Sequence, residues 1–94
     1  MAWKPTLLED SLDPWLATEA DATRRRGVLE FLVELCAHRG RLDGAIPVPG
    51  AQLPAFAAAV PDAGVVVVWV IAESYEEIAV RYLYDVRRDQ RFGG

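Results

Sequence analysis

The last third of the chain constrains the fold most, because it holds two strand-forming runs joined by a short acidic turn. The first run, 65–72, reads VVVVWVIA. It is apolar at every position, which predicts a central strand buried on both faces. The second run, 78–87, reads IAVRYLYDVR and mixes charged with aromatic residues. Together the runs predict the antiparallel centre of a small sheet.

Side chains of the second run should fall on two faces, because successive residues of a strand point in opposite directions. Strict alternation puts an apolar and aromatic set on one face: Ile78, Val80, Tyr82, Tyr84 and Val86. It puts a charged set on the other face: Arg81, Asp85 and Arg87, together with Leu83. This charged row is the best candidate for a working surface.

Helical signals occupy residues 13–38. The segment 13–15, Asp-Pro-Trp, predicts a helix start with Asp as N-cap and Pro at the first helical position. Because 18–21 could cap a second helix, a helical hairpin and a kinked helix both remain open. The last part is apolar over more than half of the helix circumference, which predicts a largely buried helix ending at Gly40. Its apolar residues are Val28, Leu29, Phe31, Leu32, Val33, Leu35 and Cys36.

Two segments fit either a strand or a helix. Residues 2–9 alternate in polarity and contain Pro5, which favours an edge strand. Residues 52–60 have apolar residues at helical spacing, but the following Pro-Asp-Ala-Gly resembles a hairpin turn. The turn favours a strand at 55–60, paired with 65–72.

The remaining segments are predicted to be irregular. Residues 40–51 contain three glycines and two prolines, which predicts the most mobile loop of the chain. The tail, 89–94, should be frayed. The elements add up to an α+β fold in a single domain, 1–94. We expect an N-terminal helix or helical hairpin packed on one face of a small antiparallel β-sheet.

Composition and charge limit the function classes. The 94 residues are 52% hydrophobic and carry a net charge of −4, which opposes strong non-specific binding to nucleic acid. The N-terminus lacks the pattern of a signal peptide and no run is long enough to span a membrane, so we expect a cytoplasmic protein. Cys36 is the single cysteine, which fits a reducing compartment and a structural core thiol.

Motifs for metals, nucleophiles and cofactors are weak. Glu30, Glu34 and His38 share a helical face, but zinc sites usually recruit more His or Cys, so we interpret the set as a solvated surface. Ser11 and Ser74 lie in no nucleophile-elbow pattern. The glycines follow neither the Walker nor the dinucleotide spacing. We therefore expect no cofactor and no metal.

Arginines supply the remaining candidates. The run 24–26 spans about 200° of a helical wheel, so its residues cannot all face one ligand. A solvated face is the simplest interpretation, and contact with phosphate or with an acidic partner is the alternative. A second set lies near the C-terminus, where Arg81, Arg87 and Arg88 alternate with Tyr82 and Tyr84. Arginine offers multidentate donors and tyrosine a stacking surface, so this set could bind a phosphodiester.

The order of these elements, with VVVVWVI at 65–71 and AVRYLYDVRRD at 79–89, resembles the RelE/ParE family of bacterial toxins over most of the chain. The resemblance implies a toxin-type protein that acts on RNA, the ribosome or another essential target and is held by a cognate antitoxin. Ribosome-dependent members are metal-independent endoribonucleases that use basic and aromatic residues on the concave sheet face. By this resemblance the candidate catalytic residues are Arg81, Tyr84, Arg87 and Arg88, with Arg81 stabilising phosphorane charge.

A non-catalytic interaction module with the same fold is the alternative function. Such a module would bind a protein partner, or form a homodimer through an edge strand or the N-terminus that carries Trp3. The net charge of −4 weakens the expectation of an RNA partner.

Overall fold

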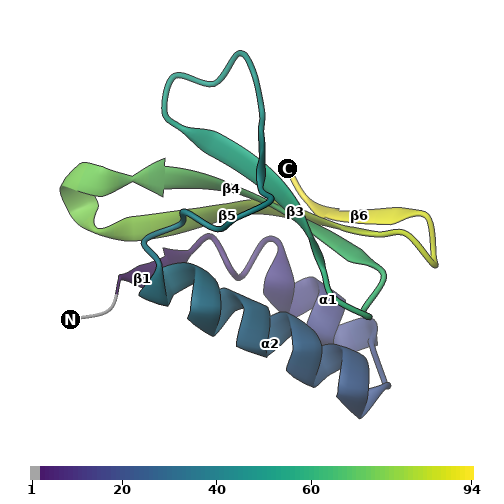
Figure 1. Ribbon diagram of the computed structural model, residues 1–94. Helices are drawn as coiled ribbons and strands as arrows, with labels where there is room; N and C mark the ends of the chain where they lie inside the picture. Colours follow the sequence, from purple (N-terminus) through teal and green to yellow (C-terminus); the bar gives the residue numbers. More distant parts are fainter. Residues whose placement is uncertain (1–2) are drawn as a thin grey trace.

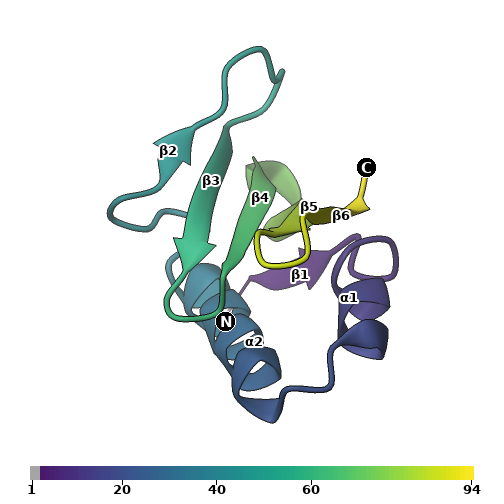
Figure 2. The ribbon, with the colours of Figure 1, turned by 90° about the vertical axis from the view of Figure 1, so that its right-hand side faces the viewer.

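The computed structural model describes residues 3–94 and combines two helices with a six-stranded sheet (Figure 1). In chain order the elements are β1 (Lys4–Thr6), α1 (Leu12–Thr18), α2 (Ala22–Ala37), β2 (Ile46–Pro47), β3 (Ala55–Val60), β4 (Val65–Ala72), the 3-10 turn η1 (Glu73–Tyr75), β5 (Glu77–Asp85) and β6 (Gln90–Gly93). Both helices lie on the same side of the sheet (Figure 2). The predicted α+β architecture, with a helical hairpin on one sheet face, is therefore confirmed.

The sheet has the strand order β1-β5-β4-β3-β2, and β6 also pairs with β5. The neighbours β2 to β6 pair antiparallel, whereas β1 runs parallel to β5. β1 lies opposite 77–79 and β6 opposite 82–85, so the two short strands follow one another along the same edge of β5. The predictions of a strand at 55–60 and of an edge strand around Pro5 are confirmed, and the helical alternatives are excluded.

The two helices start at different kinds of residue. α2 starts after Asp21, whose carboxylate accepts hydrogen bonds from the backbone N–H groups of Thr23 and Arg24 at 2.9 and 3.3 Å. The predicted cap within 18–21 is therefore confirmed. α1 starts after Ser11, so the prediction of Asp13 as N-cap is wrong by two residues. Proline at position 14 still fits, because N–H groups in the first turn have no partner within the helix.

Gly40 joins the end of α2 to the sheet. Its φ of +81° lies in the left-handed region, and its N–H donates to the Leu35 carbonyl at 2.8 Å. A Cβ at this position would lie 2.8 Å from side-chain atoms of Ile71 and Ile78. The Gly40 carbonyl also accepts a hydrogen bond from Trp69 Nε1 at 2.9 Å. Only glycine therefore lets the helix end this close to β4 and β5.

The hydrophobic core fills the space between the helices and the sheet. Its largest fully buried apolar side chains come from α1, α2, β4 and β5: Trp15, Val28, Leu35, Val65, Val67, Trp69, Ile71, Ile78, Val80 and Leu83. The β4 residues of this set are all odd-numbered, as the two-residue period requires. The even-numbered residues of β4 consequently face the side of the sheet without helices. Val66 and Val70 there are only partly buried, so β4 is central as predicted, but the prediction that it is buried on both faces is wrong.

A β-bulge interrupts the period of β5. Tyr82 lies opposite Val68, whereas Val80 lies opposite Trp69, so Arg81 is an extra residue with no partner on β4. Beyond the bulge the faces of β5 exchange. Ile78 and Val80 point into the core before it, and Leu83 and Asp85 point into the core after it. The prediction that Arg81, Asp85 and Arg87 form one row on one sheet face is therefore wrong.

Three further predictions are corrected. The tail is not frayed, because 90–93 pairs with β5 and buries Phe92 beside the core. The prediction that α2 is largely buried is wrong for its outer face, because Leu29 and Val33 are 43% and 71% exposed. Strand β5 also ends at Asp85, so Val86 and Arg87 belong to the turn before β6.

Candidate functional site

The sheet face without helices is the first candidate surface. Its centre consists of small apolar residues of β3 and β4, among them Ala57, Val66 and Val68. A shallow hollow over this centre is bordered by Val48 on one side and by Tyr82, Tyr84 and Arg91 on the other. The loop between β2 and β3 projects on this side, away from the helices (Figure 1). We call this surface the uncovered face.

Arg81 lies beside the same hollow. Together with Val70 it lines a neighbouring depression under the 50–53 loop. Arg81 is exposed and, among residues 3–94, it forms no ion pair. The bulge explains why Arg81 lies on this face. The inserted residue Arg81 and its neighbour Tyr82 both point away from the core.

Two contacts order the aromatic residues of the uncovered face. The Arg91 guanidinium lies over the Tyr82 ring, 5.1 Å from its centroid. The Tyr84 hydroxyl donates a hydrogen bond to the Asp89 carboxylate. β6 brings Arg91 there because it lies opposite Tyr84 in the β5–β6 register. Arg91, the two tyrosines and Asp89 thus lie on the β6 side of the uncovered face, and Arg81 lines the neighbouring depression.

The opposite side of β5 carries a buried ionic cluster. Asp85 is 0% exposed and accepts hydrogen bonds from Trp15 Nε1 at 3.0 Å and from Arg24 Nη2 at 2.9 Å. Arg88 Nε donates to the same carboxylate at 2.9 Å. Arg24, 8% exposed, also pairs with Glu19. These five residues form the Asp85 cluster, which ties both helices to the β5–β6 turn.

Hydrogen bonds determine the ionisation of the Asp85 carboxyl. Burial by itself opposes the charged form, but hydrogen bonds from Trp15, Arg24 and Arg88 outweigh it and hold the pKa of Asp85 well below its usual range. The backbone N–H groups of Arg87 and Arg88 add two more donors, at 3.1 and 3.3 Å. No buried polar side-chain atom in residues 3–94 lacks a partner, so the cluster is satisfied.

The four predicted site residues separate into two pairs. Arg81 and Tyr84 lie on the uncovered face. Arg88 belongs to the Asp85 cluster, and Arg87 donates to the Asp62 carbonyl at 3.3 Å. The structure therefore brings half of the predicted set together and assigns Arg87 and Arg88 contacts that stabilise the β5–β6 turn.

Sequence reasoning missed Arg91 and the burial of Asp85. Arg91 was overlooked because the tail was expected to fray, although the Phe92 beside it is an apolar residue that a terminal strand could bury. Asp85 was misplaced because nothing in the sequence marks the bulge. The interpretation of run 24–26 as a solvated face is likewise wrong for Arg24 and holds for Arg26, which is exposed.

Other candidate groups carry less chemistry. Cys36 is buried, and burial raises the pKa of its thiol, as expected for a structural cysteine. His38 Nε2 lies 3.0 Å from the Glu34 carboxylate on the exposed helix surface. Within residues 3–94, no group of three or more His, Cys, Asp or Glu side chains is arranged to hold a metal ion. Neither helix in this range is long and apolar enough to cross a membrane.

Comparison with known proteins finds no family model, no curated protein and no solved structure that matches this chain. The resemblance to RelE/ParE toxins therefore stays a prediction. Any functional proposal depends on the geometry of the uncovered face.

Proposed function

We propose that this protein is a toxin-type member of a bacterial toxin–antitoxin pair, RelE/ParE-like, and that it meets its target with the uncovered face. One observation carries the proposal. The bulge at Arg81 turns Tyr82 and Tyr84 onto the face without helices, and the pairing of β6 adds Arg91, so that this face carries two arginines and two tyrosines.

The chemistry of these side chains supports RNA as the target. Arg81 is exposed and has no carboxylate partner in the described residues, so its guanidinium can contact a phosphate without first breaking an ion pair. The Tyr84 ring offers a stacking surface for a base, and the Arg91 guanidinium over the Tyr82 ring adds a second cation on the same side. In an attack by a 2′-hydroxyl, Arg81 would neutralise the phosphorane, and Tyr84 with Asp89 would supply a hydrogen-bonded proton donor and acceptor. No step needs a metal or a cofactor.

The apolar centre of the uncovered face supports a second candidate, a non-catalytic module that binds protein. Val66, Val68 and Ala57 form this centre, and the cations lie only at its border. An apolar centre with an aromatic and arginine rim is the usual composition of a protein interface. A cognate antitoxin would use the same surface, so the two candidates differ in what the free protein does.

Expression in a bacterial host separates the two candidates. We would induce the wild-type chain, Arg81→Ala, Tyr84→Phe and the control Arg41→Ala, which removes an exposed arginine from the loop after α2. The measurements are growth, protein level and integrity of total RNA. For the proposed toxin we expect growth arrest with cleaved RNA, relief by the first two substitutions and no relief by the control.

Each other outcome has a defined meaning. Arrest with intact RNA that is relieved by Arg81→Ala would keep the toxin proposal and replace RNA by another target. Wild-type protein that accumulates without arrest would contradict the toxin proposal and favour the binding module. Relief by the Arg41→Ala control would mean that loss of any arginine, rather than the uncovered face, changes growth.

A further inference from the structure

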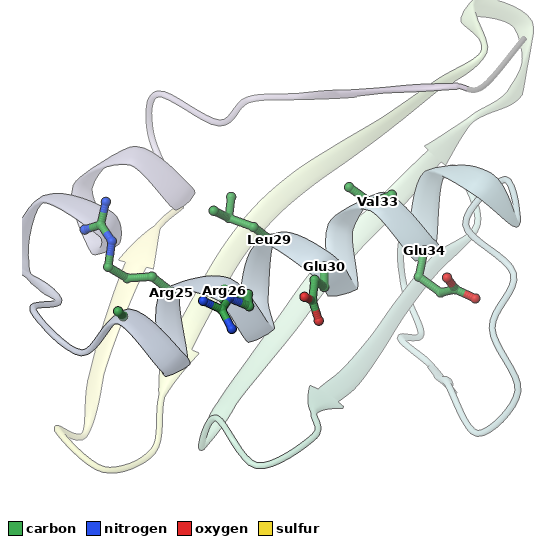
Figure 3. Close-up of a pocket in the computed structure, with 7 residues that line it drawn as sticks. Arg25, Arg26, Leu29, Glu30, Val33 and Glu34 are labelled. Atoms are coloured by element: carbon green, nitrogen blue, oxygen red, sulfur yellow. The ribbon is translucent and has the colours of Figure 1, made fainter.

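The outward face of α2 is the second surface with an unexplained composition. Leu29 and Val33 lie one turn apart, are 43% and 71% exposed, and belong to neither the buried core nor the residues packed against it. Figure 3 shows them along the helix with the charged residues that flank them. Arg26 precedes Leu29, and Glu30 and Glu34 follow it. Two exposed apolar residues at a four-residue spacing are the pattern of a helix that packs against another helix.

Positive and negative side chains on this face are separated along the helix axis. The cations lie towards the N-terminal end of the face and the carboxylates towards the C-terminal end. Arg25 already makes hydrogen bonds within the chain, because its guanidinium donates to the backbone carbonyls of Leu16 and Glu19. Arg26 is exposed and, within residues 3–94, forms no ion pair. Arg26 and Glu30 are therefore available to a partner, and Glu34, which contacts His38 on the exposed helix surface, can still be reached from solvent.

We propose that α2 packs antiparallel against α2 of a second copy of this chain, with Leu29 next to the two-fold axis. In an antiparallel pair, a residue three positions before the axis lies opposite the position three after it. Arg26 of one copy then falls between Glu30 and Glu34 of the other. The two-fold symmetry repeats this contact, so one sequence supplies both halves of the charge pattern.

Apolar residues beside α2 would enlarge the interface between the two helices. An apolar groove runs beside Leu29 and Val33 and is bordered by Trp3, Pro5 and Leu8, which belong to β1 and the residues on either side of it. These residues would cover apolar area next to the helix pair, which a specific interface needs because two helix faces alone bury little. The interface uses the helical side of the sheet, so it leaves the uncovered face open. The dimer therefore does not depend on the proposed toxin function.

Charge reversal gives a sharp test. We would measure the mass of the full chain by sedimentation equilibrium at concentrations up to about 1 mM, which covers dissociation constants of the weakest specific dimers. The variants are Arg26→Glu and the double variant Glu30→Lys/Glu34→Lys. Each places like charges opposite one another at both ends of the interface. We expect the dissociation constant to rise about tenfold or more, because the symmetry repeats every change.

Mixing the two variants provides the decisive control. In an equimolar mixture the charges become complementary again, and we expect a heterodimer of twice the 10.4 kDa chain mass with affinity near that of the wild type. Arg41→Glu makes the same charge change as Arg26→Glu outside the face and should leave the dimer intact. Circular dichroism melts check that each variant is folded.

Three results would overturn the proposal. The first is a wild-type chain that stays monomeric over the whole concentration range. The second is a dimer that both charge reversals leave unchanged, which would indicate an edge strand or the uncovered face as the interface. The third is a mixture that remains monomeric although each variant is folded.

Discussion

Replacing Asp85 by asparagine should remove a large part of the stability of this domain. The substitution keeps the shape of the side chain but removes the charge that Arg24 and Arg88 contact at 2.9 Å. Asp85 is 0% and Arg24 8% exposed, so solvent screens this pair little. Breaking a buried ion pair by removing one partner costs about 3–5 kcal/mol. Arg88 adds less than Arg24, because its side chain is 31% exposed.

This cost is large compared with the total free energy of unfolding of the domain. A chain of 94 residues has a free energy of unfolding of about 5–14 kcal/mol. At about 4–8 °C per kcal/mol, a loss of about 3–5 kcal/mol should lower the melting temperature by roughly 12–40 °C. Urea unfolding followed by far-UV circular dichroism measures the free energy without relying on Trp15, which itself contacts Asp85.

A matched control and a double variant make the result interpretable. Asp43→Asn changes an exposed aspartate and should stay within about 0.5 kcal/mol of the wild type. Arg24→Met combined with Asp85→Asn should cost less than the sum of the two single changes, because the two side chains contact each other and their ion pair can be lost only once. A loss below about 1 kcal/mol for Asp85→Asn, with an unchanged urea dependence, would show that the Asp85 cluster does not hold the helices to the β5–β6 turn.

Two further predictions concern pH and the terminal strand. Because the pKa of Asp85 is lowered in the folded state, its contribution is complete above the ordinary aspartate pKa of about 3.9 and is lost as pH falls towards the folded value. The difference in unfolding free energy between wild type and Asp85→Asn should therefore be constant near neutral pH and shrink below about pH 4. A difference that grows below about pH 4 would contradict the lowered pKa of Asp85 in the folded state. Gly93→Ala should destabilise by about 1–3 kcal/mol in thermal melts, because Gly93 has a φ of +100° and a Cβ would lie 2.7 Å from the Arg81 carbonyl oxygen. Gly94→Ala meets nothing within 4 Å and is the control; equal melting of the two variants would mean that β6 is not docked as described.

Local patterns predicted most of the architecture. The uninterrupted apolar run marked 65–72 as a central strand with the bounds that the structure gives it. The Pro-Asp-Ala-Gly turn identified 55–60 as its antiparallel neighbour. α2 begins where the Asp21 carboxylate accepts hydrogen bonds from Thr23 and Arg24, and it ends where the Gly40 N–H donates to the Leu35 carbonyl. All of these partners lie within five residues in the sequence. These elements could be predicted because each is determined by residues that lie close together in the sequence.

The candidate site was harder to predict from the sequence, because it depends on pairing between segments that lie far apart in the chain. The extra residue Arg81 changes which side chains of β5 point outward, and its position follows from the register with β4. Asp85 can be buried only because Trp15 and Arg24, 70 and 61 residues away, donate to it. Arg91 reaches the uncovered face only because β6 pairs with β5. None of these partners could be identified from the local sequence.

The most direct test combines function and folding in one variant, Arg81→Ala. Arg81 is exposed and belongs to no ion pair within residues 3–94, so we expect its loss to shift the melting temperature by no more than about 4 °C. We expect the same variant to abolish growth arrest and RNA cleavage at wild-type protein levels. Arrest that persists in a folded Arg81→Ala protein would contradict the assignment of the uncovered face as the working surface.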